Sequence, residues 1–142
     1  MIINGRNGAV NIVENGGFVS GNMSAVTFAP NILSGVDLFA SATAHSGTTM
    51  TSVTIQPGGR LDVFGGLASS ITVSAWNGLF VNSGSAADIT VSSGAKMYIG
   101  GTASSIIVSS GGSLFVADAG AALHVTSEAG AIITGNGYIE YA

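Results

Sequence analysis

Carboxylates are the residues of this chain that could most readily do chemistry. Two carboxyl groups on one face, about 5 to 10 Å apart, carry out acid–base glycoside hydrolysis. In the repeat register described below, Asp62, Asp88 and Asp118 fall in three different columns, which predicts isolated surface charges and disfavours a carbohydrate-active enzyme. The seven acidic residues are Glu14, Asp37, Asp62, Asp88, Asp118, Glu128 and Glu140.

Other reactive groups are equally sparse. His45 and His124 lie far apart in the sequence and have no matching ligands nearby, and the chain contains no cysteine. No phosphate-binding loop, nucleophile elbow or calcium-binding nonapeptide is present. The sequence therefore predicts a protein that is not an enzyme and that has no catalytic residue, metal site or cofactor.

The sequence from Val53 to Tyr138 consists of a short unit that is repeated five times. Each unit starts with an apolar–outward–apolar triplet, and the units recur at spacings of 18, 18, 17 and 17 residues. This period is too short for helical solenoids or leucine-rich repeats. The triplets are Val53-Thr-Ile55, Ile71-Thr-Val73, Ile89-Thr-Val91, Ile106-Ile-Val108 and Leu123-His-Val125.

A second strand of each unit shows the same alternation. Its two apolar positions follow the triplet and are two residues apart, which is the period of a strand with one buried face. The first of these positions holds Leu61, Leu79, Met97, Leu114 and Ala131. The second position holds Val63, Val81, Ile99, Val116 and Ile133.

Stacking is the way such short strands bury their apolar face, because each strand can pair in parallel with its counterpart in the next unit. The sequence thus predicts an all-β protein, a right-handed single-stranded parallel β-helix (β-solenoid) with coils of 17–18 residues. Glycines at the corners fit the tight turns between strands.

The outward positions form columns of their own. A threonine ladder, suited to a solvated strand face, is predicted from Thr54, Thr72, Thr90, Ile107 and His124. A hydroxyl-rich row follows it, with Gln56, Ser74, Ser92, Ser109 and Thr126. The column between the later anchors stacks three aromatic rings on consecutive coils and is the candidate binding or self-association face: Asp62, Phe80, Tyr98, Phe115 and Ile132.

The two ends of the chain are less regular. We expect one structural domain in which residues 1–50 form divergent coils and a cap, with a loop from His45 to Ser52. Regular coils are predicted for residues 51–136. Residues 137–142 form the C-terminal cap, in which Tyr138 and Tyr141 cover the last coil.

Composition excludes several classes of function. The net charge is −4 with only three basic residues, so no basic patch for nucleic acid exists. Apolar residues make up 46% of the chain but no run of about 20 occurs, which predicts no membrane insertion. The N-terminus lacks the charged start followed by an apolar core that marks a signal peptide, so we predict no signal peptide.

The Gly-Gly corners and short Ser/Thr-rich strands resemble the AIDA-type repeats of self-associating autotransporter adhesins. The matching stretches are Thr54-Ile-Gln-Pro-Gly-Gly-Arg-Leu-Asp-Val-Phe-Gly-Gly66, Thr90-Val-Ser-Ser-Gly-Ala-Lys-Met-Tyr-Ile-Gly-Gly-Thr-Ala103 and Ile107-Val-Ser-Ser-Gly-Gly-Ser-Leu-Phe-Val116. The resemblance covers about residues 53–135 well. It implies a parallel β-helix on a bacterial surface, adhesion or self-association, and glycans on Ser or Thr.

The leading hypothesis is therefore an adhesin-type repeat module that binds a protein partner or itself through the aromatic column. Its location would be the bacterial cell surface, or the medium if it is secreted. The alternative is a phage- or mobile-element-encoded inhibitor, such as an anti-defence factor, that binds a host protein in the host cytoplasm.

Overall fold

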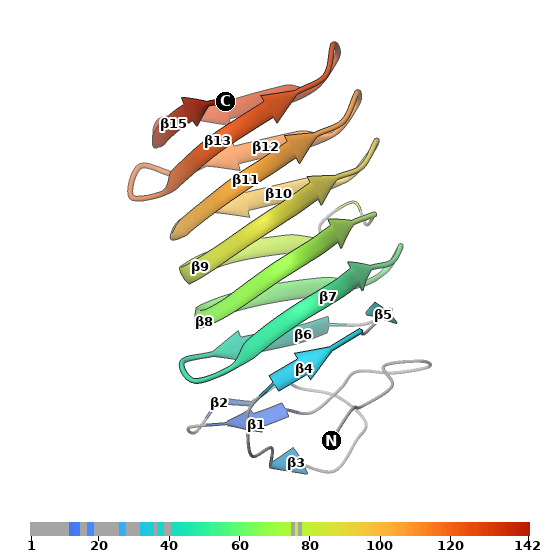
Figure 1. The fold of residues 1–142 in the computed structure, drawn as a ribbon, viewed down its shortest axis with the longest axis vertical. Helices are drawn as coiled ribbons and strands as arrows, with labels where there is room; N and C mark the ends of the chain where they lie inside the picture. The colour runs from blue at the N-terminus through green and yellow to red at the C-terminus, as the bar shows by residue number, and fades with distance from the viewer. Residues whose placement is uncertain are drawn as a thin grey trace.

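The computed structural model describes residues 12–14, 17–18, 26–27, 32–35, 37–38, 41–74, 76 and 78–142. The chain forms an all-β parallel β-solenoid of about six turns, with coils of about 18 residues (Figure 1). This confirms the predicted fold class. Among the described residues, no helix is long and apolar enough to cross a membrane.

The first strands of the chain lie at the N-terminal end of the solenoid (Figure 1). β1 pairs with β2 in antiparallel and with β3 in parallel orientation, and the three form a small separate sheet. The strands up to the regular coils are β1 (Ile12–Glu14), β2 (Gly17–Phe18), β3 (Val26–Thr27), β4 (Ile32–Ser34), β5 (Asp37–Leu38) and β6 (Ser41–His45).

The remaining strands build the regular coils. Two of them, β8 and β9, are long because they run from one side of the coil to the other without a break. They are β7 (Thr49–Ile55), β8 (Arg60–Val73), β9 (Leu79–Val91), β10 (Lys96–Ile99), β11 (Thr102–Val108), β12 (Ser113–Val116), β13 (Ala121–Ser127), β14 (Ile132–Gly135) and β15 (Tyr138–Tyr141).

Two stacks of parallel strands face each other across the core. The front stack in Figure 1 contains β7, the second halves of β8 and β9, β11, β13 and β15. The back stack contains β6, the first halves of β8 and β9, β10, β12 and β14. The front strands run to the right and upward and the back strands return behind them, so the chain winds as a right-handed coil (Figure 1).

The predicted anchor columns form the core. Ile71, Ile89 and Ile106 pair in register on successive coils, and each exposes only 1% of its surface. Leu61, Leu79, Met97 and Leu114 line up in the same way in the back stack and are equally buried. Residues one coil apart thus lie over one another and shield the same interior, as the sequence predicts.

A third side of the coil, which the apolar triplets do not reveal, adds another inward column. It precedes each triplet and consists mostly of alanine: Met50, Ala68, Ala86, Ala103 and Ala122. In each coil two residues separate this column from the next buried residue, and the second of them has φ of 52–53°: Ser52, Ser70, Asp88, Ser105 and His124. This left-handed conformation bends the strand, and none of these residues is a glycine, although glycine adopts it most easily.

The predicted register of the last unit is wrong by two residues. Ile106 pairs with Val125, which puts the spacing at 19 and moves Leu123 beside Ser104. In the back stack, Leu114 pairs with Ile133 and Val116 with Gly135. The cause is the corner at residues 117–120, between β12 and β13, which is two residues longer than the corner at residues 100–101, between β10 and β11.

The regular sheet also begins earlier than residue 51. β4 and β5 pair with β7, and β6 pairs with β8, so a further coil precedes the predicted start. The predicted loop from His45 to Ser52 is wrong at its end, because β7 begins at Thr49. Small side chains hid this coil, since Ala42 and Ala44 occupy the columns of Leu61 and Val63.

The C-terminal segment adds a final strand. β15 pairs with β13, with a register shift between Ala122 and Val125. Tyr138 and Tyr141, the predicted cap residues, expose 60% and 58% of their surface. The side chain of Ile139, between them, packs against the core and is the contact that covers the last coil from this strand.

Candidate functional site

The aromatic column lies on the outer face of the back stack. Phe80 pairs with Tyr98 and Tyr98 with Phe115 on successive strands, as the repeat register predicts. Their ring centroids are 5.8 and 5.7 Å apart, with interplanar angles of 30° and 12°. These are offset-stacked pairs, each worth about 0.5–1.5 kcal/mol beyond the area they bury.

Exposure increases along this column. Phe80 and Tyr98 are half-buried by their neighbours, whereas Phe115 exposes 45% of its surface. Phe115 is more open because Thr134, and not another ring, occupies the next place in the column. The apolar surface that a partner could contact is therefore greatest at the C-terminal end.

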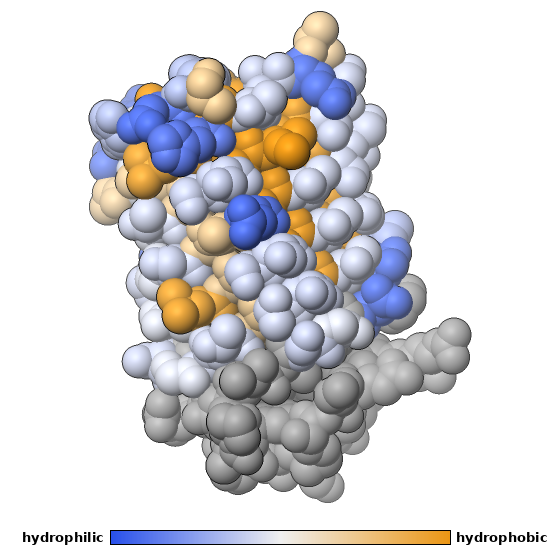
Figure 2. Space-filling view, viewed as in Figure 1, coloured by the Kyte–Doolittle hydropathy of each residue, from blue (hydrophilic) through white to orange (hydrophobic). Residues whose placement is uncertain are grey.

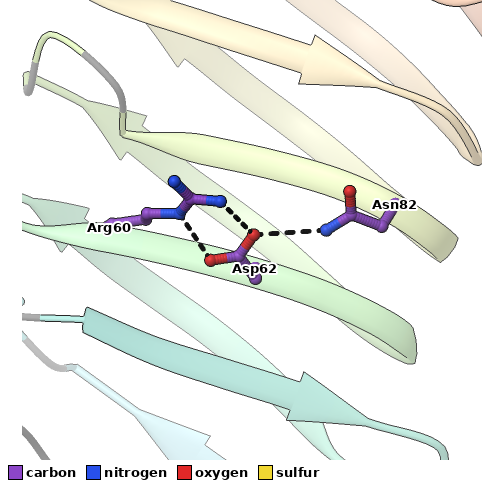
Figure 3. Close-up of polar contacts among 3 residues, drawn as sticks. All are labelled: Arg60, Asp62 and Asn82. Carbon is purple, nitrogen blue, oxygen red and sulfur yellow. Dashed lines mark hydrogen bonds and ion pairs between the residues drawn. The ribbon is translucent and has the colours of Figure 1, made fainter.

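A polar cluster closes the other end of the column. Asp62 lies under Phe80 in the register, and Arg60 forms a bidentate ion pair with it, at 2.6 Å from Nε to Oδ2 and 2.8 Å from Nη2 to Oδ1 (Figure 3). Asn82 donates a further hydrogen bond to Oδ1 at 3.2 Å. The Arg60 guanidinium also lies 3.9 Å from the centroid of the Phe80 ring. Cation, carboxylate and ring thus form one connected unit.

This cluster changes the properties of two residues. The hydrogen bonds that Arg60 donates to Asp62, together with the charge of that carboxylate, raise the pKa of Arg60 above its usual value, against a smaller opposing effect of burial. Asp62 itself exposes only 8% of its surface, although the sequence places it on the binding face. A partner approaching this face therefore meets Arg60 and Phe80 before it reaches the carboxylate.

Ile132 does not continue the aromatic column as predicted. It pairs with Ser113, which in turn pairs with Lys96, so it lies in the outward row beside the rings. Ile132 exposes 54% of its surface and lines a groove of about 420 Å³ together with Lys96, Phe115 and Thr134. The slipped register of the last coil is the cause, and Ile132 still contributes to the same outer face.

Lys96 and Trp76 mark the edge of this face. The Nζ of Lys96 lies 5.4 Å from the centroid of the Trp76 ring, within the range of a cation–π contact. Trp76 is in the corner between β8 and β9 and exposes 69% of its surface. We call this pair the Trp76–Lys96 edge.

A second surface, on the front stack, was missed by the sequence reasoning. Figure 2 shows apolar atoms along a narrow seam across the front strands, with hydrophilic residues beside it. A groove of about 380 Å³ crosses β9, β11 and β13 there. We call it the front groove, and it is lined by Asp88, Ile89, Thr90, Ser105, Ile106, Ile107, His124 and Thr126.

Three polar residues of this groove belong to the column of residues with φ of 52–53°, which we call the bent column. Asp88, Ser105 and His124 occupy the positions with positive φ on three successive coils. His124 therefore does not extend the threonine ladder as predicted, and Thr126 takes that place beside Ile107. The Nδ1 of His124 lies 3.1 Å from Oε1 of Glu140 and links β13 to β15.

A sequence signal for this column did exist. The five bent positions recur at spacings of 18, 18, 17 and 19, always just before the apolar triplet. The signal is weak because serine is common throughout the chain, and because the predicted register of the last unit assigned His124 to the threonine ladder instead.

The remaining candidates for chemistry stay apart. Asp62 lies on the back stack, Asp88 in the front groove and Asp118 in the corner after β12, which confirms that the three occupy different columns. Glu128 accepts a hydrogen bond from the backbone N–H of Ser110 at 3.0 Å. Within the described part of the chain, no cluster of three or more potential metal ligands exists. The side chains of Glu14 and His45 lie outside the described part of the structure.

Comparison with known proteins identifies the kind of solenoid. The chain is similar to the crystal structure of a fragment of TibA, an autotransporter adhesin, that is hyper-glycosylated by TibC. The two share 25% sequence identity and a TM-score of 0.64, over 91% of this chain and 52% of that one. The resemblance to AIDA-type adhesin repeats is confirmed. No family model and no curated protein sequence matches the chain.

The TibA match bears on the functional hypotheses to different degrees. The chain spans about half the length of the TibA fragment. The matched TibA domain is a part of an adhesin and is not an enzyme. The match gives no support to the alternative of a phage-encoded inhibitor.

Proposed function

We propose that this chain is a non-enzymatic adhesin module of a bacterial surface, and that copies of it associate through the outer face of the back stack. The similarity to the TibA solenoid over 91% of the chain supports the class of protein. The choice of face rests on the row of stacked rings that ends at the exposed Phe115.

Two features of this face favour a protein contact. The rings are held by their neighbours and by Arg60, so little side-chain entropy is lost when a partner covers them. Exposed apolar residues next to one another also mark interaction sites more often than scattered ones do. Phe115 and Ile132 are such neighbours, because they line one groove.

Sedimentation velocity over a range of concentrations tests this proposal. The double substitution Tyr98→Ser with Phe115→Ser removes two rings of the face, and we expect it to weaken association at least about tenfold. Leu67→Ser is the matched control, because Leu67 is 55% exposed and pairs with Ser85 on the front stack. Circular dichroism verifies that both variants are folded.

The result has two clear outcomes. Loss of association in the ring variant with retention in the Leu67 control supports the aromatic face. A wild-type chain that remains monomeric at every concentration, or a ring variant that associates as the wild type does, would show the proposal to be wrong.

Glycosylation of the hydroxyl rows is the second candidate property. The TibA fragment is hyper-glycosylated by TibC, and this chain presents serines and threonines on both stacks and at its corners. We expect co-expression with TibC to add sugar increments to the intact mass. Expression without TibC is the control, and an unchanged mass in both samples would contradict this expectation.

A further inference from the structure

The Trp76–Lys96 edge carries a charge that none of the described residues neutralises. Arg60 is held by Asp62, whereas Lys96 has no ion-pair partner among the described residues. Its contact is with the ring of Trp76, and both side chains are exposed. Tryptophan is enriched at protein interfaces because its ring supplies contact area, and a charge beside it can fix the orientation of a partner.

The front groove has the complementary chemistry. Asp88 lines it, is exposed, and has no ion-pair partner within the described part of the chain. Ile107, which exposes 46% of its surface, gives the groove an apolar wall. A volume of about 380 Å³ is at the lower end of the range for ligand-sized pockets and is large enough for one aromatic side chain.

These two surfaces lie on different stacks of the same molecule. Lys96 is the first residue of β10 in the back stack, and Asp88 is in the front half of β9. They cannot satisfy each other within one chain, since the solenoid core separates them. Between two copies, the cation and indole of one can face the carboxylate and isoleucine of the other.

We infer that the Trp76–Lys96 edge of one copy docks into the front groove of a second copy. The inference rests on the proposed self-association and specifies it: the partner of the back stack is the front stack of the next molecule. Such a contact is heterologous, so it does not close on itself at two subunits and continues into rings or open chains. Lys96 then pairs with Asp88, and Trp76 covers Ile107.

A reciprocal charge exchange tests this contact. Lys96→Glu and Asp88→Lys each place like charges across the contact, and we expect each variant alone to associate at least about tenfold more weakly than the wild type. Mixed in equal amounts, the two variants again present opposite charges at every contact, so association returns. Sedimentation velocity of each variant and of the mixture gives the readout.

Two controls accompany the exchange. Asp118→Lys reverses an exposed acid in the corner after β12, outside the groove, and must leave association unchanged. Trp76→Ala is expected to weaken association at least about tenfold, because interfacial tryptophans are frequent hot spots. Circular dichroism melts show that each variant is folded.

The outcomes separate this inference from the broader proposal. Weakening in both single variants with rescue in the mixture supports the contact. Association that is lost in the ring variant but unchanged by either charge reversal, or that stops at a dimer, overturns this contact and leaves the aromatic face standing. A wild-type chain that never associates overturns both.

Discussion

The inner coils and the last coil use the same columns but obtain different burial from them. Ile71, Ile89 and Ile106 have a coil above and below, and each exposes 1% of its surface. Ile133 and Ile139 have a coil on one side only and are partly buried. The comparison shows that an apolar side chain in a solenoid is buried by the coils above and below it. The residues of its own coil are not enough to bury it.

Two kinds of corner in the solenoid use glycine for different reasons. In the inner corner after β9, Gly94 has φ of +75° and open space around its missing Cβ. In the longer corner before β13, Gly120 has an ordinary φ, but a Cβ there would collide with the backbone carbonyl of Ile99 on the coil below. Glycine thus answers a conformational need in one corner and a packing need in the other.

Replacing one core isoleucine in each region gives the largest expected effect. Ile106→Ala leaves a cavity between two coils and should lower the free energy of unfolding by about 2–5 kcal/mol. Ile133→Ala should cost clearly less, because that side chain is already in part exposed to solvent. Urea unfolding of the Ile106→Ala variant measures its loss of stability.

Hydrogen exchange distinguishes global from local unfolding in these variants. Since stability in repeat proteins is a sum of neighbour contacts, Ile133→Ala should loosen β14 and β15 and leave the amides of β9 protected. Equal loss of protection in β9 from both variants would contradict the difference between inner and last coils.

The two corner glycines give the next effect. Gly120→Ala should destabilise by about 3 kcal/mol, because the new methyl group meets backbone atoms that cannot move independently. Gly94→Ala meets no atoms and should cost about 1–2 kcal/mol from the left-handed conformation alone. Thermal unfolding of the two variants measures both. A smaller effect at Gly120 than at Gly94 would show that the longer corner adapts more easily than its packing suggests.

The bent column offers the smallest effect, and it has the opposite sign. Ser105→Gly removes the Cβ that strains the backbone in the left-handed conformation. It should raise the free energy of unfolding by about 0.5–1 kcal/mol, after the entropy cost of glycine is subtracted. His124→Gly relieves the same strain in the last coil but loses the contact with Glu140. Its net gain should therefore be smaller, and denaturant midpoints of the two variants are the measurement. A larger gain at His124 would mean that the contact with Glu140 contributes nothing.

The anchor columns were predictable because large apolar side chains recur at a regular spacing, each with a second apolar residue two positions away. The repeat of Ile71, Ile89 and Ile106 is visible without coordinates, and so is the stack of rings from Phe80 to Phe115. Ala42 and Ala44 were overlooked because alanine is common outside cores as well as within them. The alanine column of the third side escaped notice for the same reason.

The last unit shows why register needs coordinates. The pair Leu123 and Val125 fits the triplet pattern as well as the true pairing of Val125 with Ile106 does, so apolar spacing alone cannot choose. The corner before it is longer, and corners leave little apolar signal. In the back stack, a shift of two residues preserves the inward and outward alternation, so Ile133 stays inward in another column. In the front stack, the bend at His124 interrupts the alternation, and Leu123 leaves the predicted core column for the place beside Ser104.

The sequence by itself determined the fold class, the period and the buried columns, because those depend on local alternation repeated many times. It also placed Phe80, Tyr98 and Phe115 in one outward row. Only the tertiary structure brought Asp88, Ser105 and His124 together and placed Lys96 on the opposite stack. Those relations depend on corner lengths and strand bends, and small differences in them are fixed by the contact of each coil with the next.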